Sequence, residues 1–156
     1  MKIYSHRGNL SGKDSQENEP AFIKQCLAGG FHVEIDLWFI DNKYFLGHDE
    51  PTYRIDIDEF DHEEVIFHLK TPHLPLLRRA DAFAIENDPY VLTLRGLLWM
   101  NYGQTPGVRS VMCSPELVGH SLGVEAFVRT IAGRAAGLCT DYPLRAAEAL
   151  ARLAAE

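Results

Sequence analysis

The sequence predicts an α/β domain built on a parallel sheet, and three observations support this fold class. At 156 residues, the chain is long enough for one domain with a continuous core. Segments with helical spacing separate several apolar runs, and such alternation favours parallel strands joined by crossovers. The apolar runs themselves are short, end in polar residues and recur as buried strands do, at residues 2–5, 30–37, 65–69, 82–85, 97–100, 108–113 and 136–140.

The predicted helices are fewer than the strands. Apolar residues at helical spacing within residues 21–27 precede the stop signal Gly29-Gly30, so the chain opens with strand, helix and strand. We also expect a short helix over residues 74–79, a longer irregular helix over residues 115–131, and an alanine-rich helix over residues 143–155.

This alternation is compatible with a compact TIM-type (βα)8-like barrel. A complete barrel of this type usually takes about 250 residues, so several outer helices must be shortened or missing. The shortening falls at residues 88–107, which have room for strand and turn but not for full helices. No repeat or linker divides the sequence, so we expect residues 1–156 to form a single domain.

Composition excludes several classes of protein. The hydrophobic fraction of 46% and the charged fraction of 24% argue against disorder. A formal net charge of −7 disfavours nucleic-acid binding, which depends on clustered Lys and Arg. No apolar run reaches the roughly 18 residues of a membrane span, and no signal-peptide core is present, so we expect a cytoplasmic protein. Three scattered cysteines predict buried thiols rather than disulfides.

Glu34 and Asp36 are the first candidate functional residues. On a strand, residues two apart point to the same face, so the two carboxylates lie side by side while Val33 and Ile35 point the other way. The pair could be solvent-exposed acids on an edge strand. The flanking apolar residues favour a buried strand, in which two like charges require a cation, and oxygen ligands indicate Mg²⁺ or Ca²⁺.

Two histidines follow other predicted strands. His6 and Arg7 leave the first strand, at the end where α/β barrels carry their active sites. Arg7 can bind phosphate through two parallel donors, and His6 can carry a proton near neutral pH. His48 ends another apolar run, and Asp49 beside it can orient the imidazole. Two histidines, a carboxylate pair and an arginine suit metal-assisted phosphodiester cleavage.

In this order, these residues resemble the glycerophosphodiester phosphodiesterase family and its wider relatives, the barrel-shaped phosphatidylinositol phospholipases C and spider-type phospholipases D. The resemblance is carried by motifs in the first third of the chain and near its end: His6-Arg7-Gly8, Glu17-Asn18 followed by Ala21-Phe22, Gly30, Glu34-Ile35-Asp36, Gly47-His48-Asp49, Phe67-His68-Leu69-Lys70 and Thr140-Asp141-Tyr142-Pro143.

The resemblance implies a (βα)8 barrel in which a divalent metal assists hydrolysis of a glycerophosphodiester. By this resemblance, His6 and His48 would act as acid and base. Arg7 and Lys70 would bind the phosphate, and Glu34 and Asp36 would ligate the metal. Glu17 matches a family glutamate that lies near the metal and the His-Arg pair. Residues 140–143 match the end of the family's last strand.

One departure concerns the metal. Where the family places a third ligating glutamate, two residues before the lysine, this chain has His68. A neutral imidazole lowers the negative charge of the site and shifts its preference from Mg²⁺ or Ca²⁺ toward Mn²⁺ or Zn²⁺. Glu86 or Asp88 could replace the missing carboxylate, although their sequence context reads more simply as a turn.

The sequence leaves three functions open. The first is hydrolysis of a small-molecule phosphodiester, and the second is a lyase reaction in which a substrate hydroxyl attacks and forms a cyclic phosphate. The third is a catalytically silent barrel that binds phosphorylated ligands or a protein partner. Strand faces left bare by missing helices also predict a homo-oligomer.

Overall fold

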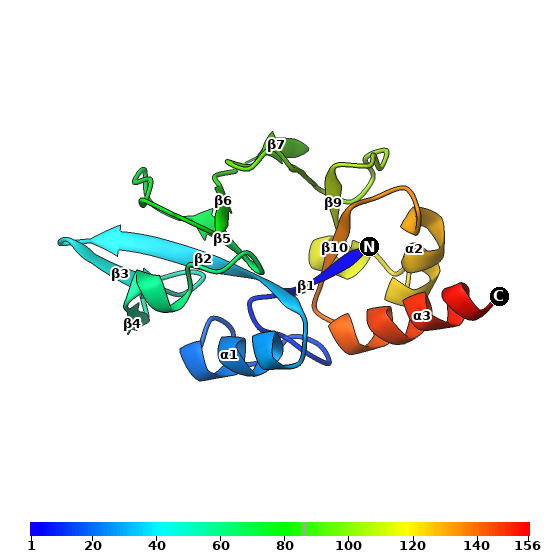
Figure 1. Cartoon of the computed structure of the whole chain (residues 1–156), viewed down its shortest axis with the longest axis horizontal. Helices are drawn as coiled ribbons and strands as arrows, with labels where there is room; N and C mark the ends of the chain where they lie inside the picture. The colour runs from blue at the N-terminus through cyan, green and yellow to red at the C-terminus, as the bar shows by residue number, and fades with distance from the viewer. Residues whose placement is uncertain (86) are drawn as a thin grey trace.

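One curved sheet of ten strands organises the computed structural model, which describes residues 1–85 and 87–156 (Figure 1). Its strands are β1 (Lys2–His6), β2 (His32–Ile40), β3 (Lys43–Leu46), β4 (Tyr53–Ile55), β5 (Val65–Leu69), β6 (Asp81–Phe83), β7 (Tyr90–Leu92), β8 (Leu98–Met100), β9 (Ser110–Cys113) and β10 (Gly137–Thr140). The helices are α1 (Pro20–Ala28), α2 (Val124–Ile131) and α3 (Pro143–Ala155), with 3-10 turns η1 (Ile57–Glu59) and η2 (Pro115–Val118).

Parallel strands form the central arc of this sheet, in the order β8-β9-β10-β1-β2-β5-β6. Each of the seven apolar runs in the sequence corresponds to one of these strands, so the predicted parallel α/β architecture is confirmed. The crossover between β1 and β2 contains α1, and Gly29 ends that helix as expected.

Two antiparallel hairpins extend the arc and were not predicted. β2 runs past Leu37 to Ile40 and turns at Asp41 and Asn42, which both have positive φ, into β3 and then β4. At the other end, β7 pairs antiparallel with β8. This second hairpin occupies the shortened region, residues 88–107, where we expected strand and turn but no full helix.

The arc does not close into a ring by strand pairing within the described residues. β6 pairs with β5 and β8 pairs with β7 and β9, but β6 and β8 do not pair with each other. The segment after β7 reaches β6 through a backbone hydrogen bond in which Leu94 N–H donates to the Ala82 carbonyl, 2.9 Å away. The fold is therefore an α/β fold with a curled mixed sheet that is open on one side, and strand pairing does not complete the predicted (βα)8-like barrel.

Helices cover the outer face of the arc on one side. α1 packs on β2 and β5 through a core that includes Ile23, Ile35 and Phe67. α2 and α3 pack together against β9 and β10. Figure 1 shows α1, α2 and α3 along the lower and right parts of the molecule, and the described residues form no helix beside β6 and β7.

Two helix predictions differ from the structure. Residues 74–79 are not helical, because Pro75 supplies no N–H and the carboxylate of Asp61 accepts the backbone N–H groups of Arg78, Arg79 and Ala80 instead. The segment 115–131 divides into η2 and α2. Gly119, with φ of 71°, ends the first of these in the left-handed region. The helix over 143–155 is confirmed.

In the part of the chain that the structure describes, no helix has the length and apolar character required to cross a membrane.

Candidate active site

A cavity of about 450 Å³ lies at the carboxyl ends of the parallel strands. Most of the residues singled out in the sequence line it: His6, Arg7, Glu17, Glu34, His48 and His68. Asp36 and Lys70 are not among the lining residues. Asp36 has no exposed surface and contacts Arg7, His68 and Lys70 from below the cavity. Asp141, near the other end of the chain, also lines the cavity, so segments from both ends come together at this edge of the sheet.

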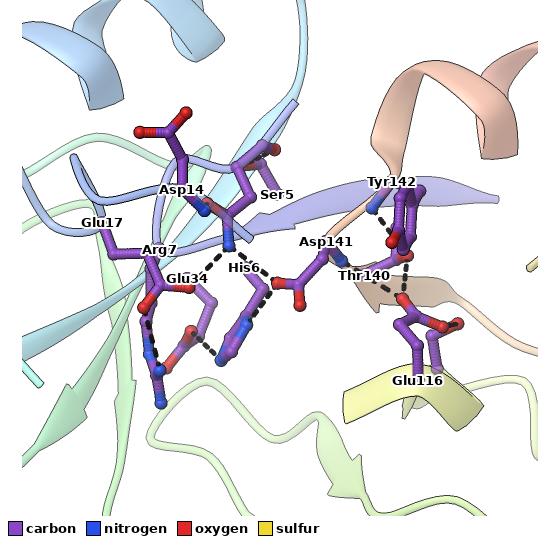
Figure 2. Close-up of polar contacts among 12 residues, drawn as sticks. Ser5, His6, Arg7, Asp14, Glu17, Glu34, Glu116, Thr140, Asp141 and Tyr142 are labelled. Carbon is purple, nitrogen blue, oxygen red and sulfur yellow. Dashed lines mark hydrogen bonds and ion pairs between the residues drawn. The ribbon is translucent and has the colours of Figure 1, made fainter. Parts of the chain in front are cut away.

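His6, the last residue of β1, lies between two carboxylates (Figure 2). Its Nδ1 is 2.7 Å from Oδ1 of Asp141, and its Nε2 is 3.9 Å from Oε2 of Glu34. Burial opposes protonation of His6, but the hydrogen bond with Asp141 and the charge of Glu34 outweigh it, so the pKa of His6 is raised. Because Nδ1 donates to a carboxylate, Nε2 is the nitrogen that faces the cavity.

Glu34 and Asp36 lie on the inner face of β2, as predicted, while Val33 and Ile35 pack in the outer core. Burial and the neighbouring charge of Asp36 raise the pKa of Glu34. Burial also opposes ionisation of Asp36, but the close contact with the imidazole of His68 and the positive charge of Arg7 keep its pKa well below the usual range. The pair is not a set of exposed acids on an edge strand.

Two oxygens of this pair are buried without a hydrogen-bond partner: Oε2 of Glu34 and Oδ1 of Asp36. A buried carboxylate oxygen is costly to leave unpaired, so these atoms fit a cation ligand set. Glu34, Asp36 and His68 each offer one donor atom, and these atoms lie within 4.8 Å of one another. Two carboxylates and an imidazole are donors that divalent metals accept.

Arg7 and Asn18 hold Asp36 from the side opposite His68. Nε of Arg7 lies 2.9 Å from Oδ2 of Asp36, as an ion pair rather than an aligned hydrogen bond. Nδ2 of Asn18 donates to the same oxygen at 2.9 Å, and its Oδ1 accepts the backbone N–H of Asp36 at 2.9 Å. Arg7 and Asn18 both have positive φ, of 54° and 64°, and Asn18 N–H donates to the Arg7 carbonyl.

His68 lies beside Asp36 because β2 and β5 pair in parallel with these two residues in register. Its Nδ1 is 3.1 Å from Oδ1 of Asp36 and 3.8 Å from Oε1 of Glu34. The imidazole stacks on Phe83, with ring centroids 4.9 Å apart and planes 11° from parallel. The structure thus brings His68 to the carboxylate pair, at the place where the family resemblance put a third ligand.

Glu17 lies on the other side of His6. One of its oxygens accepts from Arg7 Nη1 at 3.3 Å and the other from Asn9 Nδ2 at 2.8 Å. The same Asn9 amide donates to Asp141 at 2.8 Å. Glu17, His6 and Asp141 are close enough to hold an ion, but hydrogen bonds already use both oxygens of Glu17, Nδ1 of His6 and Oδ1 of Asp141. Glu17 therefore supports Arg7 and Asn9, and its role as a metal ligand stays a prediction.

His48 lies at the mouth of the cavity, with its Nδ1 2.7 Å from Oδ1 of Asp49, as expected. Burial and the positive charge of Arg7 lower its pKa. Gly47 before it has a φ of 150°, and a Cβ there would lie 2.0 Å from the Glu50 carbonyl oxygen. A glycine is therefore required for the turn that presents His48.

Two further predictions concern the periphery of the site. Lys70 Nζ lies 3.7 Å from Oδ1 of Asp36. Glu86 lies outside the described residues, so its suggested ligand role has no structural counterpart here. Asp88 is exposed, and the candidate metal groups among the described residues do not include it.

Asp141, Asn9 and Glu116 were not singled out as site residues. Asp141 follows β10, so the rule that active residues leave the carboxyl ends of strands could have found it. Glu116, from η2, accepts from the Thr140 hydroxyl and from Asp141 N–H at 3.2 Å, which fixes the end of β10 (Figure 2). No sequence pattern relates Glu116 or Asn9 to residues so distant along the chain.

Comparison with solved structures places this geometry in a known architecture. A crystal structure of a glycerophosphodiester phosphodiesterase from Parabacteroides distasonis ATCC 8503 matches with a TM-score of 0.60, 14% sequence identity, and coverage of 98% of both chains. The chain has the fold of this phosphodiesterase. The resemblance to glycerophosphodiester phosphodiesterases that the motifs predicted is thereby confirmed at the level of the fold. No protein-family model and no curated protein sequence matches the chain.

Proposed function

We propose that this protein is a metal-dependent phosphodiesterase that hydrolyses a glycerophosphodiester-like small phosphodiester, with His6 and His48 as acid and base. One observation carries the proposal. Oε2 of Glu34 and Oδ1 of Asp36 are buried and unpaired beside a cavity that both histidines and Arg7 line. The fold shared with a glycerophosphodiester phosphodiesterase supports the substrate class.

Glu34, Asp36 and His68 would hold the divalent ion, as the buried oxygens without hydrogen-bond partners and the closeness of the three donor atoms suggest. When bound, such an ion would polarise a phosphoryl oxygen and offset the negative charge that develops on phosphorus. Arg7 and Lys70 add positive charge on either side of Asp36, and they would hold the remaining phosphate oxygens.

The two histidines would divide the proton transfers. His6 is tied through Nδ1 to Asp141 and His48 through Nδ1 to Asp49, so each presents Nε2 to the substrate. One Nε2 would take a proton from the attacking water and the other would protonate the leaving alkoxide. Asp141 and Asp49 would keep each ring oriented during the reaction.

The test measures turnover of glycerophosphodiesters by the purified chain with added Mg²⁺, Ca²⁺, Mn²⁺ or Zn²⁺, and follows products by phosphorus NMR. We expect a phosphomonoester in the presence of metal. His6→Ala and His48→Ala should each lower turnover by roughly 10²–10⁴-fold, the usual contribution of one acid–base group, while the exposed His120→Ala should match the parent.

Other products would identify the alternatives. A cyclic phosphate as the end product would make the protein a lyase. Absence of turnover with all four metals would contradict catalysis and leave a protein that only binds phosphorylated ligands or a partner. Activity unchanged in both His6→Ala and His48→Ala would contradict the acid–base roles of these two residues.

A further inference from the structure

His68 is held in one orientation by three contacts. Its ring stacks on Phe83, its Nε2 lies 3.4 Å from the backbone carbonyl oxygen of Ile85, and its Nδ1 lies 3.1 Å from Asp36. Its position in β5, in register with Asp36 of β2, fixes the backbone from which it projects. The imidazole is therefore directed at the carboxylate pair by the sheet and by its neighbours.

The two ring nitrogens of His68 have different partners. Nε2 faces the backbone carbonyl of Ile85, which only accepts hydrogen bonds, so Nε2–H can donate to it. Nδ1 faces Oδ1 of Asp36 and Oε1 of Glu34, and a cation bound there would take the place of the Nδ1 proton while Nε2 keeps its own. A ligating histidine whose other nitrogen donates to a backbone carbonyl is the usual arrangement around protein-bound metals.

Glu34 and Asp36 are both buried and incompletely hydrogen-bonded. Glu34 is 3% exposed and Asp36 is fully buried, and each has an oxygen without a hydrogen-bond partner. Glu34, Asp36 and His68 each offer one donor atom, and these three atoms lie within 4.8 Å of one another. Buried carboxylate oxygens without a hydrogen-bond partner among the described residues indicate a ligand rather than a solvated cluster.

We infer that this cation site binds a borderline divalent ion of the Fe²⁺ to Zn²⁺ series through Nδ1 of His68, in preference to Mg²⁺ or Ca²⁺. The inference rests on the proposed function for the presence of a cation, and goes beyond it in naming the class of ion and the nitrogen that selects it.

The preference follows from donor chemistry. Imidazole nitrogen suits Zn²⁺, Fe²⁺, Ni²⁺ and Cu²⁺, whereas Mg²⁺ and Ca²⁺ prefer oxygen. Mg²⁺ also retains several waters, and Ca²⁺ takes six to eight oxygens. The three donors here include one nitrogen, so this set departs from the all-oxygen surroundings that Mg²⁺ and Ca²⁺ prefer.

The first experiment measures binding of Co²⁺ and Mg²⁺ to the metal-free, full-length chain by calorimetry, without substrate. His68→Gln keeps the size of the side chain but removes the imidazole, and His120→Gln is the matched control on an exposed histidine. We expect the ratio of Co²⁺ to Mg²⁺ affinity to fall by about tenfold or more in His68→Gln, as loss of a metal's supporting contacts does, and to stay unchanged in His120→Gln.

A second variant and a spectroscopic signal cover the case in which His68→Gln folds poorly. His68→Glu restores an all-carboxylate set, and it should reverse the preference toward Mg²⁺ and Ca²⁺. Pulsed electron paramagnetic resonance of the Cu²⁺-loaded parent should show modulation from the remote nitrogen of one imidazole. That modulation should persist in His6→Gln and be absent from the His68 variants.

Three results would overturn the inference. The first is a ratio of Co²⁺ to Mg²⁺ affinity that falls by less than about tenfold in His68→Gln, and the second is an unchanged metal preference in His68→Glu. The third is a nitrogen modulation of the Cu²⁺ signal that depends on His6 instead of His68. These outcomes are distinguishable from failure of the proposed function. If the chain binds metal through His68 but has no turnover, only the proposed function is contradicted. If the chain turns over substrate with Mg²⁺ and substitution of His68 has no effect, only this inference is contradicted.

Discussion

Asn18 holds Asp36 at two points, through the side-chain amide and the backbone N–H, and both partners are fully buried. Its loss would leave the backbone N–H of Asp36 without an acceptor and remove one donor from a buried carboxylate. Because Asn18 has a φ of 64°, glycine is the replacement that removes these bonds without backbone strain.

We predict that Asn18→Gly lowers the free energy of unfolding by about 1–3 kcal/mol, the cost of unpaired buried polar groups. Asn42→Gly is the matched control, since Asn42 also has positive φ but lies exposed in the β2–β3 turn. Chemical denaturation of both variants measures the difference. Equal losses in the two variants would show that glycine entropy, and not the contact with Asp36, accounts for the effect.

Asp141 positions the imidazole of His6, and its hydrogen bond decides which nitrogen faces the cavity. In Asp141→Asn, the side-chain amide can donate to Nδ1 and so move the proton of His6 to Nε2. We predict a loss of kcat of roughly 10²–10⁴-fold, comparable with removal of an acid–base group, with a changed pH profile and a similar KM. Asp41→Asn, in the exposed β2–β3 turn, should have no effect.

A change in KM with kcat unaltered, or an unchanged pH profile in Asp141→Asn, would contradict the positioning role.

The contact between His6 and Asp141 could not be predicted from the sequence. His6, Glu34 and His68 could be predicted because each sits in a short motif at a strand end. The partnership of His6 with Asp141 joins residues 135 positions apart, and it exists only because β1 and β10 are neighbours in the sheet.

At the scale of elements, Asp61 organises the segment that replaces the helix expected at residues 74–79. Its carboxylate accepts three successive backbone N–H groups, from Arg78, Arg79 and Ala80. Burial opposes ionisation of Asp61, but these three bonds outweigh it, so its pKa is lowered in the folded protein. The segment leads directly into β6, one edge of the parallel arc.

We predict that Asp61→Ala lowers the free energy of unfolding by about 1–3 kcal/mol, whereas Asp58→Ala, on the exposed η1 turn, does not. A group with a lowered folded pKa stabilises fully above its unfolded pKa, and that stabilisation is lost as pH falls through the folded pKa. The difference between parent and Asp61→Ala should therefore be constant from pH 5 to 8 and narrow below about pH 4. Denaturation curves across this range provide the test, and a difference that widens in acid would contradict this account.

The apolar runs predicted the parallel strands because a strand buried on both faces is continuous in its hydrophobicity. The same signal could not show where β2 leaves the arc. The apolar run was placed at residues 30–37, whereas β2 continues to Ile40 and its hairpin into β3 depends on the turn at Asp41 and Asn42. The predicted helix over 74–79 was wrong for a related reason, because Asp61, a residue outside the segment, accepts the backbone N–H groups at its end.

At the scale of the whole molecule, the side of the arc without helices carries exposed apolar side chains. They come from the segment before β6 and from β7: Leu74, Leu76, Tyr90, Leu92 and Leu94. Apolar surface of this kind commonly pairs with another subunit. The homo-oligomer that we expect from the missing outer helices stays a prediction. These exposed residues are the ones that we expect at its interface.

We predict that light scattering at micromolar concentration gives a mass above that of one chain, and that Leu76→Glu with Leu92→Glu reduces it to a monomer. Val108→Glu is the control, because Val108 is also highly exposed but lies outside this group. A monomeric parent would refute the oligomer, and an oligomer that survives both substitutions would place its interface elsewhere.

Length alone indicated that several outer helices of a barrel are shortened or missing, but it could not show that the arc stays open between β6 and β8. The approach of these two edges depends on contacts such as the hydrogen bond from Leu94 to Ala82, and no local pattern encodes them. The site does not require full closure, because its residues come from β1, β2, β5, β10 and the loops that follow them.

Metal-stimulated turnover of a glycerophosphodiester by the parent, His6→Ala and His48→Ala is the decisive test of the proposed phosphodiesterase activity. We expect a phosphomonoester from the parent with added divalent metal, and turnover lowered by roughly 10²–10⁴-fold in each variant. A parent that is inactive with every metal offered would contradict the proposed activity, and variants that turn over substrate as fast as the parent would contradict the acid–base roles of His6 and His48.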